Sequence, residues 1–416
     1  MTLREEKPEI TLDSDRLLAG VLGNNRRAMD FGEVAFLSVF KEILVGDFAP
    51  ISFNGSLKLS HMRLVWVWLS RDVMPEIKQH LLGVKDIDSA KSALQPHLSE
   101  LIAKASDAIF LASDNPDTER RLIAQLGGEE IKLRLPIIIN TLKCNSLLSK
   151  ASSFGKSSNS LEDDELEEAI LSLPLKEKRV TSLLFHAIVG QTKDPSRLII
   201  AASNIIGGAL EKSYKGAGFE PLIEAMFAHA QNQISIIEDQ AGHFGDVDLI
   251  CNAIIRYHHL MRAIGGNVEI ERGSHWYKTT AELTKFMAQR IEPRLNNVSF
   301  NVNSAMRKPR SGPDKVDADQ LLSALNGIYL LVAVRQARET LALNAIFEKI
   351  WGETGQSLEV LIDRNMEVLK QDPTNAIVLA RLDAGIKMAG LRFGQEYGDV
   401  LLRAKQVIER RQKQAV

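Results

Sequence analysis

The spacing of apolar residues constrains the fold of this chain more than any other feature. Within residues 246–264, apolar side chains recur in steps of three and four, at Val247, Ile250, Ile254, Tyr257, Met261 and Ile264. This interval matches the 3.6-residue turn of an α-helix and places the side chains on one face. The pattern also occurs at Leu222, Met226, Ala230, Ile234 and Ile237. The sequence therefore predicts an all-α protein, a multi-helix array of antiparallel helical hairpins that is compatible with a repeat-like arrangement.

Residues that start and stop helices separate the periodic segments. Asn115-Pro116 combines a capping residue with a proline suited to a first turn, and Gly127-Gly128 suits the end of that helix. Asp194-Pro195 and Asp372-Pro373 are further starts of the same kind. Aromatic residues make up only 6% of the chain, which favours helix over sheet.

One segment departs from the helical pattern. Residues 51–59 read Ile-Ser-Phe-Asn-Gly-Ser-Leu-Lys-Leu, with apolar and polar residues alternating on both sides of Asn54-Gly55. An Asn-Gly pair suits a two-residue type I′ turn, because both central residues need a positive φ. We expect one short β-hairpin near 50–60, and it must pack on helices because an isolated hairpin is marginally stable.

Two stretches resemble linkers. Residues 151–160 are rich in serine, and residues 303–314 contain Arg-Lys-Pro-Arg-Ser-Gly, which does not suit a continuing helix. These breaks predict three domains: residues 1–150 with the small hairpin, a central helical domain at 160–302, and a C-terminal helical domain at 315–416. Looped excursions within one continuous helical array would produce the same signals.

Composition and charge narrow the cellular setting. The chain has 51 basic and 53 acidic residues, a net charge of −2, and therefore no global attraction to nucleic acid or anionic lipid. Its two cysteines, Cys144 and Cys251, have no metal-ligand or redox spacing and fit a reducing compartment. The charged N-terminus lacks an apolar signal region, and no apolar run is long enough for a bilayer. We expect a soluble cytoplasmic protein, although an exported effector would look the same.

Catalytic motifs are largely missing. Gly155-Lys156-Ser157 resembles the end of a phosphate-binding loop, but Lys150 stands where its first glycine belongs. The densest group of potential metal ligands includes His243, Asp246 and His258, and lacks any established ligand spacing. We expect no metal and no cofactor, and keep a pocket around 243–259 as the site of an alternative, an all-helical enzyme. Whether the chain is an enzyme stays open, with the balance against it.

The C-terminal region carries one family resemblance. Asp372-Pro373-Thr374-Asn375 matches a turn between helical repeats, the small or apolar residues Leu379, Leu382 and Ala384 lie near packing positions, and residues 387–390 match an interhelix turn. Residues 372–405 thus resemble a single tetratricopeptide (TPR) helical hairpin. Asp383 departs from the family's usual glycine, and no second copy follows at 34 residues. The resemblance implies a groove for a partner peptide.

These observations predict a non-catalytic interaction protein, a scaffold or adaptor that binds another protein. Trp276, Tyr277 and Arg272 are the candidate partner-binding residues, because aromatic and arginine side chains anchor interfaces. Core packing at the start of a helix would explain the two aromatic residues equally well. Besides the enzyme, a nucleic-acid accessory protein is an alternative, with basic residues near Arg272 and at 307–310.

Overall fold

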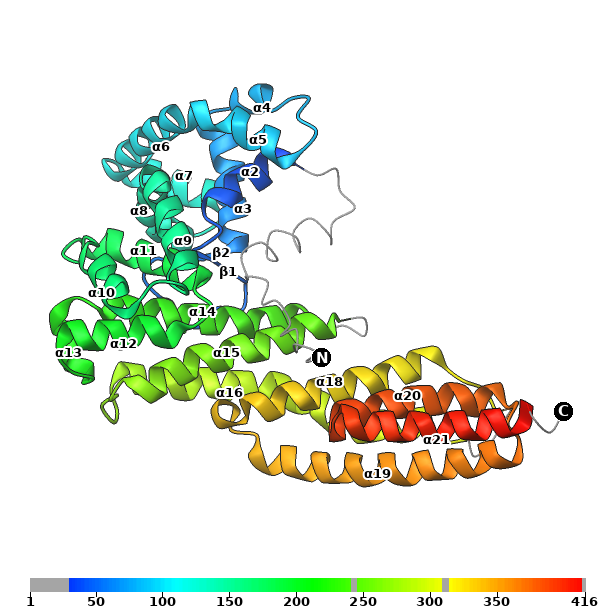
Figure 1. Cartoon of the computed structure of the whole chain (residues 1–416). Helices are drawn as coiled ribbons and strands as arrows, with labels where there is room; N and C mark the ends of the chain where they lie inside the picture. Colours follow the sequence, from blue (N-terminus) through cyan, green and yellow to red (C-terminus); the bar gives the residue numbers. More distant parts are fainter. Residues whose placement is uncertain (1–29, 241–244, 309–313, 414–416) are drawn as a thin grey trace. The chain divides into compact units, whose positions relative to one another are not determined.

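The computed structural model describes residues 30–240, 245–308 and 314–413, and most of this part of the chain is helical (Figure 1). The all-α prediction is confirmed. The helices of the first half are α2 (Phe31–Val39), α3 (Leu59–Trp68), α4 (Ile77–His80), α5 (Ile87–Leu94), α6 (Leu98–Ser113), α7 (Pro116–Leu126), α8 (Glu129–Lys143), α9 (Asn145–Ser157), α10 (Asp163–Leu171), α11 (Lys178–Gln191) and α12 (Pro195–Ile206), with a π-helical turn at Leu69–Val73 and a 3₁₀ turn at Gln95–His97. They are followed by α13 (Glu211–Ala217), α14 (Glu220–Asp239), α15 (Val247–Asn267), α16 (His275–Asn296), α17 (Val298–Met306), α18 (Ala318–Leu341), α19 (Asn344–Gln371), α20 (Ala376–Phe393) and α21 (Gln395–Lys413).

The chain packs as two compact units. One comprises the chain up to Ser235 together with His259–Thr280, and the other comprises Ile236–His258 together with Ala281–Val416. The boundaries fall within α14, α15 and α16, and so they differ from the boundaries expected at 151–160 and 303–314. Among the described residues, no helix combines the length and apolar character that a bilayer span requires.

In the first unit, polar side chains of the buried helix α14 hold an extended segment, residues 46–56. The Gln231 side-chain amide donates to the Ile51 carbonyl at 2.9 Å and accepts from the Ile51 N–H at 3.0 Å. Asn232 accepts from the Gly46 N–H at 2.9 Å, and Ser235 accepts from the Phe48 N–H at 3.3 Å. Backbone polar groups that leave water need such partners, which explains why α14 carries amide side chains that are almost fully buried.

The β element near 50–60 is present, but it differs from the expected hairpin. Strands β1 (Leu44–Val45) and β2 (Leu57–Lys58) pair in parallel, with Leu44 opposite Leu57. The Asn54-Gly55 turn does form, and the Ser56 N–H donates to the Phe53 carbonyl at 3.4 Å. Only Gly55 has a positive φ there, at +80°, whereas a type I′ turn needs two such residues. Residues 46–51, which precede this turn, bond to side chains of α14 and not to β2. The segment between β1 and β2 is therefore a crossover between parallel strands, and no hairpin forms.

The serine-rich stretch at 151–160 is not a linker, which corrects the prediction. Helix α9 continues through Ser157, and Gly155 lies directly against α11. A Cβ at position 155 would stand 2.5 Å from the Ile188 carbonyl oxygen, so glycine permits a close contact between the two helices.

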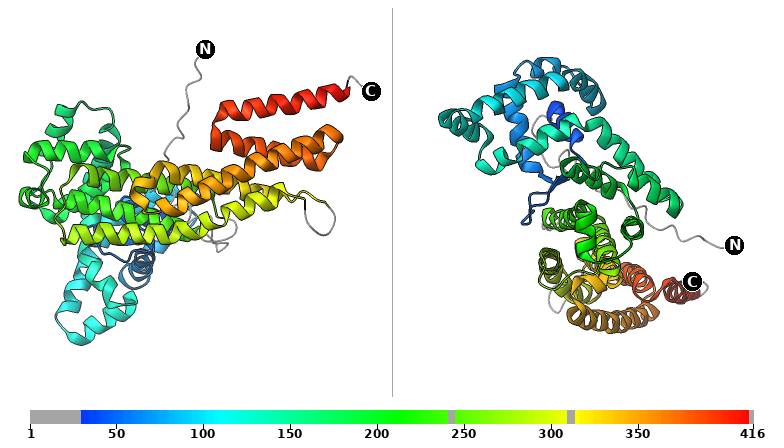
Figure 2. Two further views of the ribbon diagram at one scale, coloured as in Figure 1. Left: turned by 90° about the horizontal axis from the view of Figure 1, so that it is seen from below. Right: turned by 90° about the vertical axis from the view of Figure 1, so that its left-hand side faces the viewer.

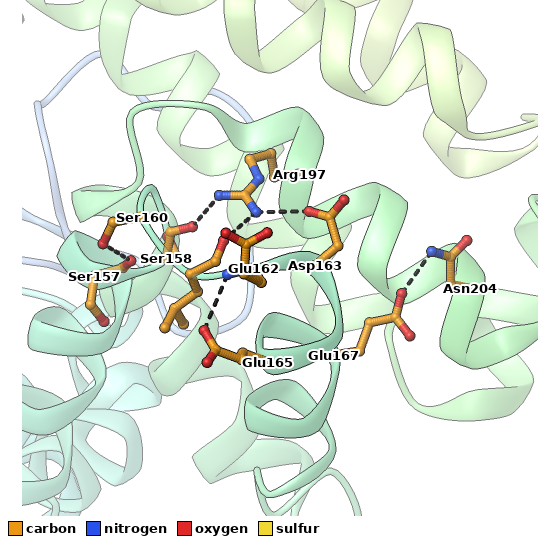
Figure 3. A network of polar contacts seen from close by, with 10 residues as sticks. Ser157, Ser158, Ser160, Glu162, Asp163, Glu165, Glu167, Arg197 and Asn204 are labelled. Carbon is orange, nitrogen blue, oxygen red and sulfur yellow. Dashed lines mark hydrogen bonds and ion pairs between the residues drawn. The ribbon is translucent and has the colours of Figure 1, made fainter.

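Arg197, on α12, fixes the chain that follows α9 (Figure 3). Its guanidinium donates to the carbonyls of Ser158 at 2.8 Å and Leu161 at 2.6 Å, and to the Asp163 carboxylate at 2.7 Å. Asp163 begins α10, whose first turn is closed by a reciprocal bond pair between Glu162 and Glu165. This stretch is therefore a tightly bound connection inside the first unit.

The second expected linker, 303–314, is described only in part. Residues 303–306 belong to α17, and residues 309–313 lie outside the described residues. Asp314 pairs with the buried Arg381 of α20 at 2.6 Å. The end of this stretch is therefore attached to the second unit.

Helices α17 to α21 pack against one another in the second unit (Figure 2). Asn375 caps α20 by accepting from the Val378 N–H, so a helix does start after Asp372-Pro373, as the sequence predicts. Residues 387–390, however, lie inside α20, and the turn to α21 comes at Gly394, with φ +110°. Gly390 and Gly398 face each other near this turn, where a Cβ on Gly398 would be 3.0 Å from the Gly390 Cα. This close approach explains the glycine within α21.

Candidate functional site

The candidate contact residues from the sequence have very different exposures. Trp276 is 1% exposed, with its ring nearly perpendicular to that of Tyr214 at a centroid distance of 6.5 Å and the Lys215 ammonium 5.0 Å from the ring centre. Tyr277 is 50% exposed, and Arg272 is exposed. Trp276 is thus a core residue of the first unit and does not offer an anchor to a partner, whereas its two neighbours remain accessible.

The alternative site around 243–259 is not assembled in the described part of the chain. His243 lies outside the described residues. Asp246 caps α15 and accepts from the N–H groups of Asp248 and Leu249, while the buried His258 bonds through Nδ1 to the Thr340 hydroxyl at 3.1 Å. Asp246 and His258 are roughly 18 Å apart along the helix axis. No group of three potential metal ligands occurs among the described residues.

A groove of about 780 Å³ opens in the first unit between α6, α8 and the chain leading into α11. Its apolar floor is formed by side chains of these three segments, and its polar rim includes four basic residues. The floor consists of Ile109, Phe110, Pro136, Ile139 and Val180.

Two residues of the floor, Phe110 and Pro136, expose apolar surface to solvent. Phe110 is 67% exposed, although it lies near the C-terminal end of a well-packed helix. Pro136 lies in the interior of α8, where it cannot donate to the carbonyl four residues earlier. A proline costs about 3 kcal/mol relative to alanine within a helix. Both residues lie outside the buried core of the first unit.

Four cationic side chains surround this floor. Lys143 ends α8, Lys176 precedes α11, and Lys178 and Arg179 begin it. All four are exposed, and within the described chain none of them forms an ion pair. Glu177 is the carboxylate that lines the groove, so the lining residues carry a net charge of +3. The helix dipole does not stabilise the three cations near the N-terminus of α11, because it favours cations at the C-terminus of a helix.

The groove is lined mostly by apolar and cationic side chains. Cys144 follows Lys143 in the chain, and burial, together with the charge of Glu177, raises the pKa of its thiol. The lining residues otherwise comprise amines, a guanidinium, two serine hydroxyls, an amide and the single carboxylate Glu177. An apolar floor within a cationic rim can bind a ligand that is itself apolar along one side and anionic along the other.

Sequence reasoning did not find this groove. The basic run Lys176-Glu177-Lys178-Arg179 and the proline in α8 were both visible, but their proximity to Phe110 depends on the packing of α6 against α8. Comparison of the chain with protein-family models, with curated proteins and with solved structures found no match.

Proposed function

We propose that this protein is a non-catalytic interaction protein and that the groove between α6 and α8 binds an acidic, amphipathic segment of a protein partner. The observation that carries the proposal is the exposed side chain of Phe110 within a rim of four cations that form no ion pair with the described residues. Covering Phe110 would contribute about 1.5–3 kcal/mol to binding. The cations would select carboxylate-bearing partners and accelerate association.

The chemistry of the floor favours a protein over a nucleic acid. Single-stranded nucleic acids are held by aromatic side chains that stack on successive bases. The floor offers one aromatic ring, and its other members are aliphatic or proline. Aliphatic surface is better matched by leucine, isoleucine or valine side chains of a partner.

A site-specific crosslink tests the proposal. A photoreactive phenylalanine analogue at position 110 is expected to capture a protein in cells of the native host, and mass spectrometry should map the crosslink to an acidic segment. The same analogue at position 82 is the matched control, because Leu82 is 77% exposed in the same unit and does not line the groove.

Charge reversal completes the experiment. Combining Lys143→Glu with Arg179→Glu should reduce the crosslink at position 110 at least tenfold without changing the circular dichroism spectrum. Equal capture from positions 82 and 110, or capture unaffected by charge reversal, would refute the groove as the binding site. Crosslinking to RNA or DNA would instead support the nucleic-acid alternative.

A further inference from the structure

A second charged cluster, in the other unit, surrounds a tryptophan. The guanidinium carbon of Arg392, on α20, lies 3.2 Å from the centre of the Trp351 ring, and that of Arg335, on α18, lies 5.0 Å from it. Trp351 itself is on α19. Three helices therefore direct two cations and one aromatic ring to the same place.

The Arg392 side chain is held in position by the backbone. Its Nη2 donates to the Trp351 carbonyl at 3.0 Å. Gly355 makes room for it, because a Cβ at this position would be 3.2 Å from the same nitrogen. The Arg392 Nε is buried and has no hydrogen-bond acceptor in the described chain. The guanidinium is thus held in position by the backbone of α19.

The two arginines repel each other. Burial and the charge of Arg335 lower the pKa of Arg392 to about 10, and Glu359 opposes them only weakly. Neither guanidinium has a carboxylate within ion-pair distance in the described residues, although Arg338, also on α18, pairs with Glu348 at 3.5 Å. Two cations beside one ring, with the Glu359 carboxylate beyond ion-pair distance, cost free energy that a bound anion would recover.

We infer that Arg335 and Arg392 form a binding site for an oxyanion, either a phosphate or a carboxylate, next to Trp351. The guanidinium carbons of Arg335 and Arg392 lie 5.0 Å and 3.2 Å from the centre of the Trp351 ring. The distance between the two carbons therefore cannot exceed the sum of these two values. A guanidinium N–H reaches an oxygen acceptor about 2.9 Å away, and its planar fork suits the oxygens of both anion types. This site is separate from the proposed groove and does not depend on it.

Trp351 provides a built-in reporter. Of the four tryptophans, Trp66, Trp68 and Trp276 are at most 2% exposed, whereas Trp351 is half-buried. Titration of the full chain with inorganic phosphate, pyrophosphate or succinate, against sodium chloride at matched ionic strength, should give a saturable change in tryptophan emission. The phosphate and succinate arms distinguish a phosphoryl ligand from a carboxylate ligand.

Variants locate the site. Arg335→Gln and Arg392→Gln should each weaken the apparent affinity for the active anion at least tenfold, whereas Arg338→Gln, on the same helix, should change it less than twofold. Because Arg335 is exposed, its variant is expected to fold, and circular dichroism checks this. The inference is overturned if none of the three anions gives a saturable change, or if Arg335→Gln and Arg338→Gln behave alike.

Discussion

At the scale of single residues, the first unit depends on titratable groups that folding removes from water. The His186 ring donates to the Asn54 carbonyl at 2.8 Å and is 1% exposed. Nearby, Glu42 is 6% exposed and accepts two bonds from the Gln191 amide, at 2.8 and 2.9 Å. Burial raises the pKa of the Glu42 carboxyl. His186 and Gln191 thus connect α11 to Asn54 and Glu42 through hydrogen bonds that depend on the protonation states of the His186 ring and the Glu42 carboxyl.

His186 should make the protein sensitive to mild acid. Burial lowers the pKa of His186 from 6.5 to about 4, more than the bond to Asn54 raises it. Between these values the unfolded chain binds a proton that the folded chain does not, so the free energy of unfolding falls as pH falls from 6.5 to 4, by about 3 kcal/mol in total. Glu42 acts in the opposite direction, since a raised carboxyl pKa lowers stability as pH rises above 4.5.

The variant His186→Gln isolates this effect, because glutamine keeps an N–H donor for Asn54 and does not titrate. We expect urea unfolding to show a flatter dependence of stability on pH between 4 and 6.5 in the variant than in the native protein. Parallel pH dependences for the two proteins would show that the His186 proton does not contribute.

At the scale of elements, the connection between α9 and α10 shows how a weakly helical stretch becomes ordered. Residues 151–160 combine serines with a glycine, and neither type favours helix. Gly155 nevertheless fits against α11, and Arg197 binds the carbonyls that follow the helix. Charge-assisted bonds to otherwise unpaired carbonyls are among the stronger polar contacts in proteins.

Removing the guanidinium should therefore loosen this connection. We expect Arg197→Met to lower the free energy of unfolding by about 1–3 kcal/mol, as for other hydrogen bonds to charged groups, and to speed hydrogen exchange at residues 157–163. Arg120→Met is the control, because Arg120 is 80% exposed and its ion pair with Asp117 is fully accessible to solvent. If both variants lost the same stability, the Arg197 network would have no special role.

At the scale of the whole molecule, the compact units decide which fragments fold. The range 160–302 lacks α9 and the segment 46–56, both of which pack on its helices. The range 236–416 contains all of the second unit. Fragment stability therefore tests the division directly.

We expect fragment 236–416 to unfold cooperatively on heating and fragment 160–302 to lack a cooperative transition, as followed by circular dichroism. Fragment 160–302 would expose the faces of α11 and α14 that are buried in the intact protein. Cooperative melting of 160–302 would favour the three domains expected from the sequence over the two compact units.

The sequence by itself determined the helical character and many helix ends, since these depend on neighbouring residues. Apolar side chains at steps of three and four form the buried faces of α14 and α15. Asn115 caps α7 by accepting from the Asp117 N–H, and Gly127 ends that helix with φ +87°. Such signals act within a few residues, so they can be identified from the sequence without knowledge of the tertiary structure.

Tertiary structure alone decided the β pairing, the order at 151–160 and the surfaces that we propose for binding. The parallel strands follow from the amide side chains of α14, more than 170 residues away along the chain. Phe110 and Lys178, like Arg335 and Arg392, are distant in sequence and meet only after helices pack. The physical reason is that hydrogen bonds form at about 3 Å and screened charges interact within about 10 Å, and only the folded chain brings these groups that close.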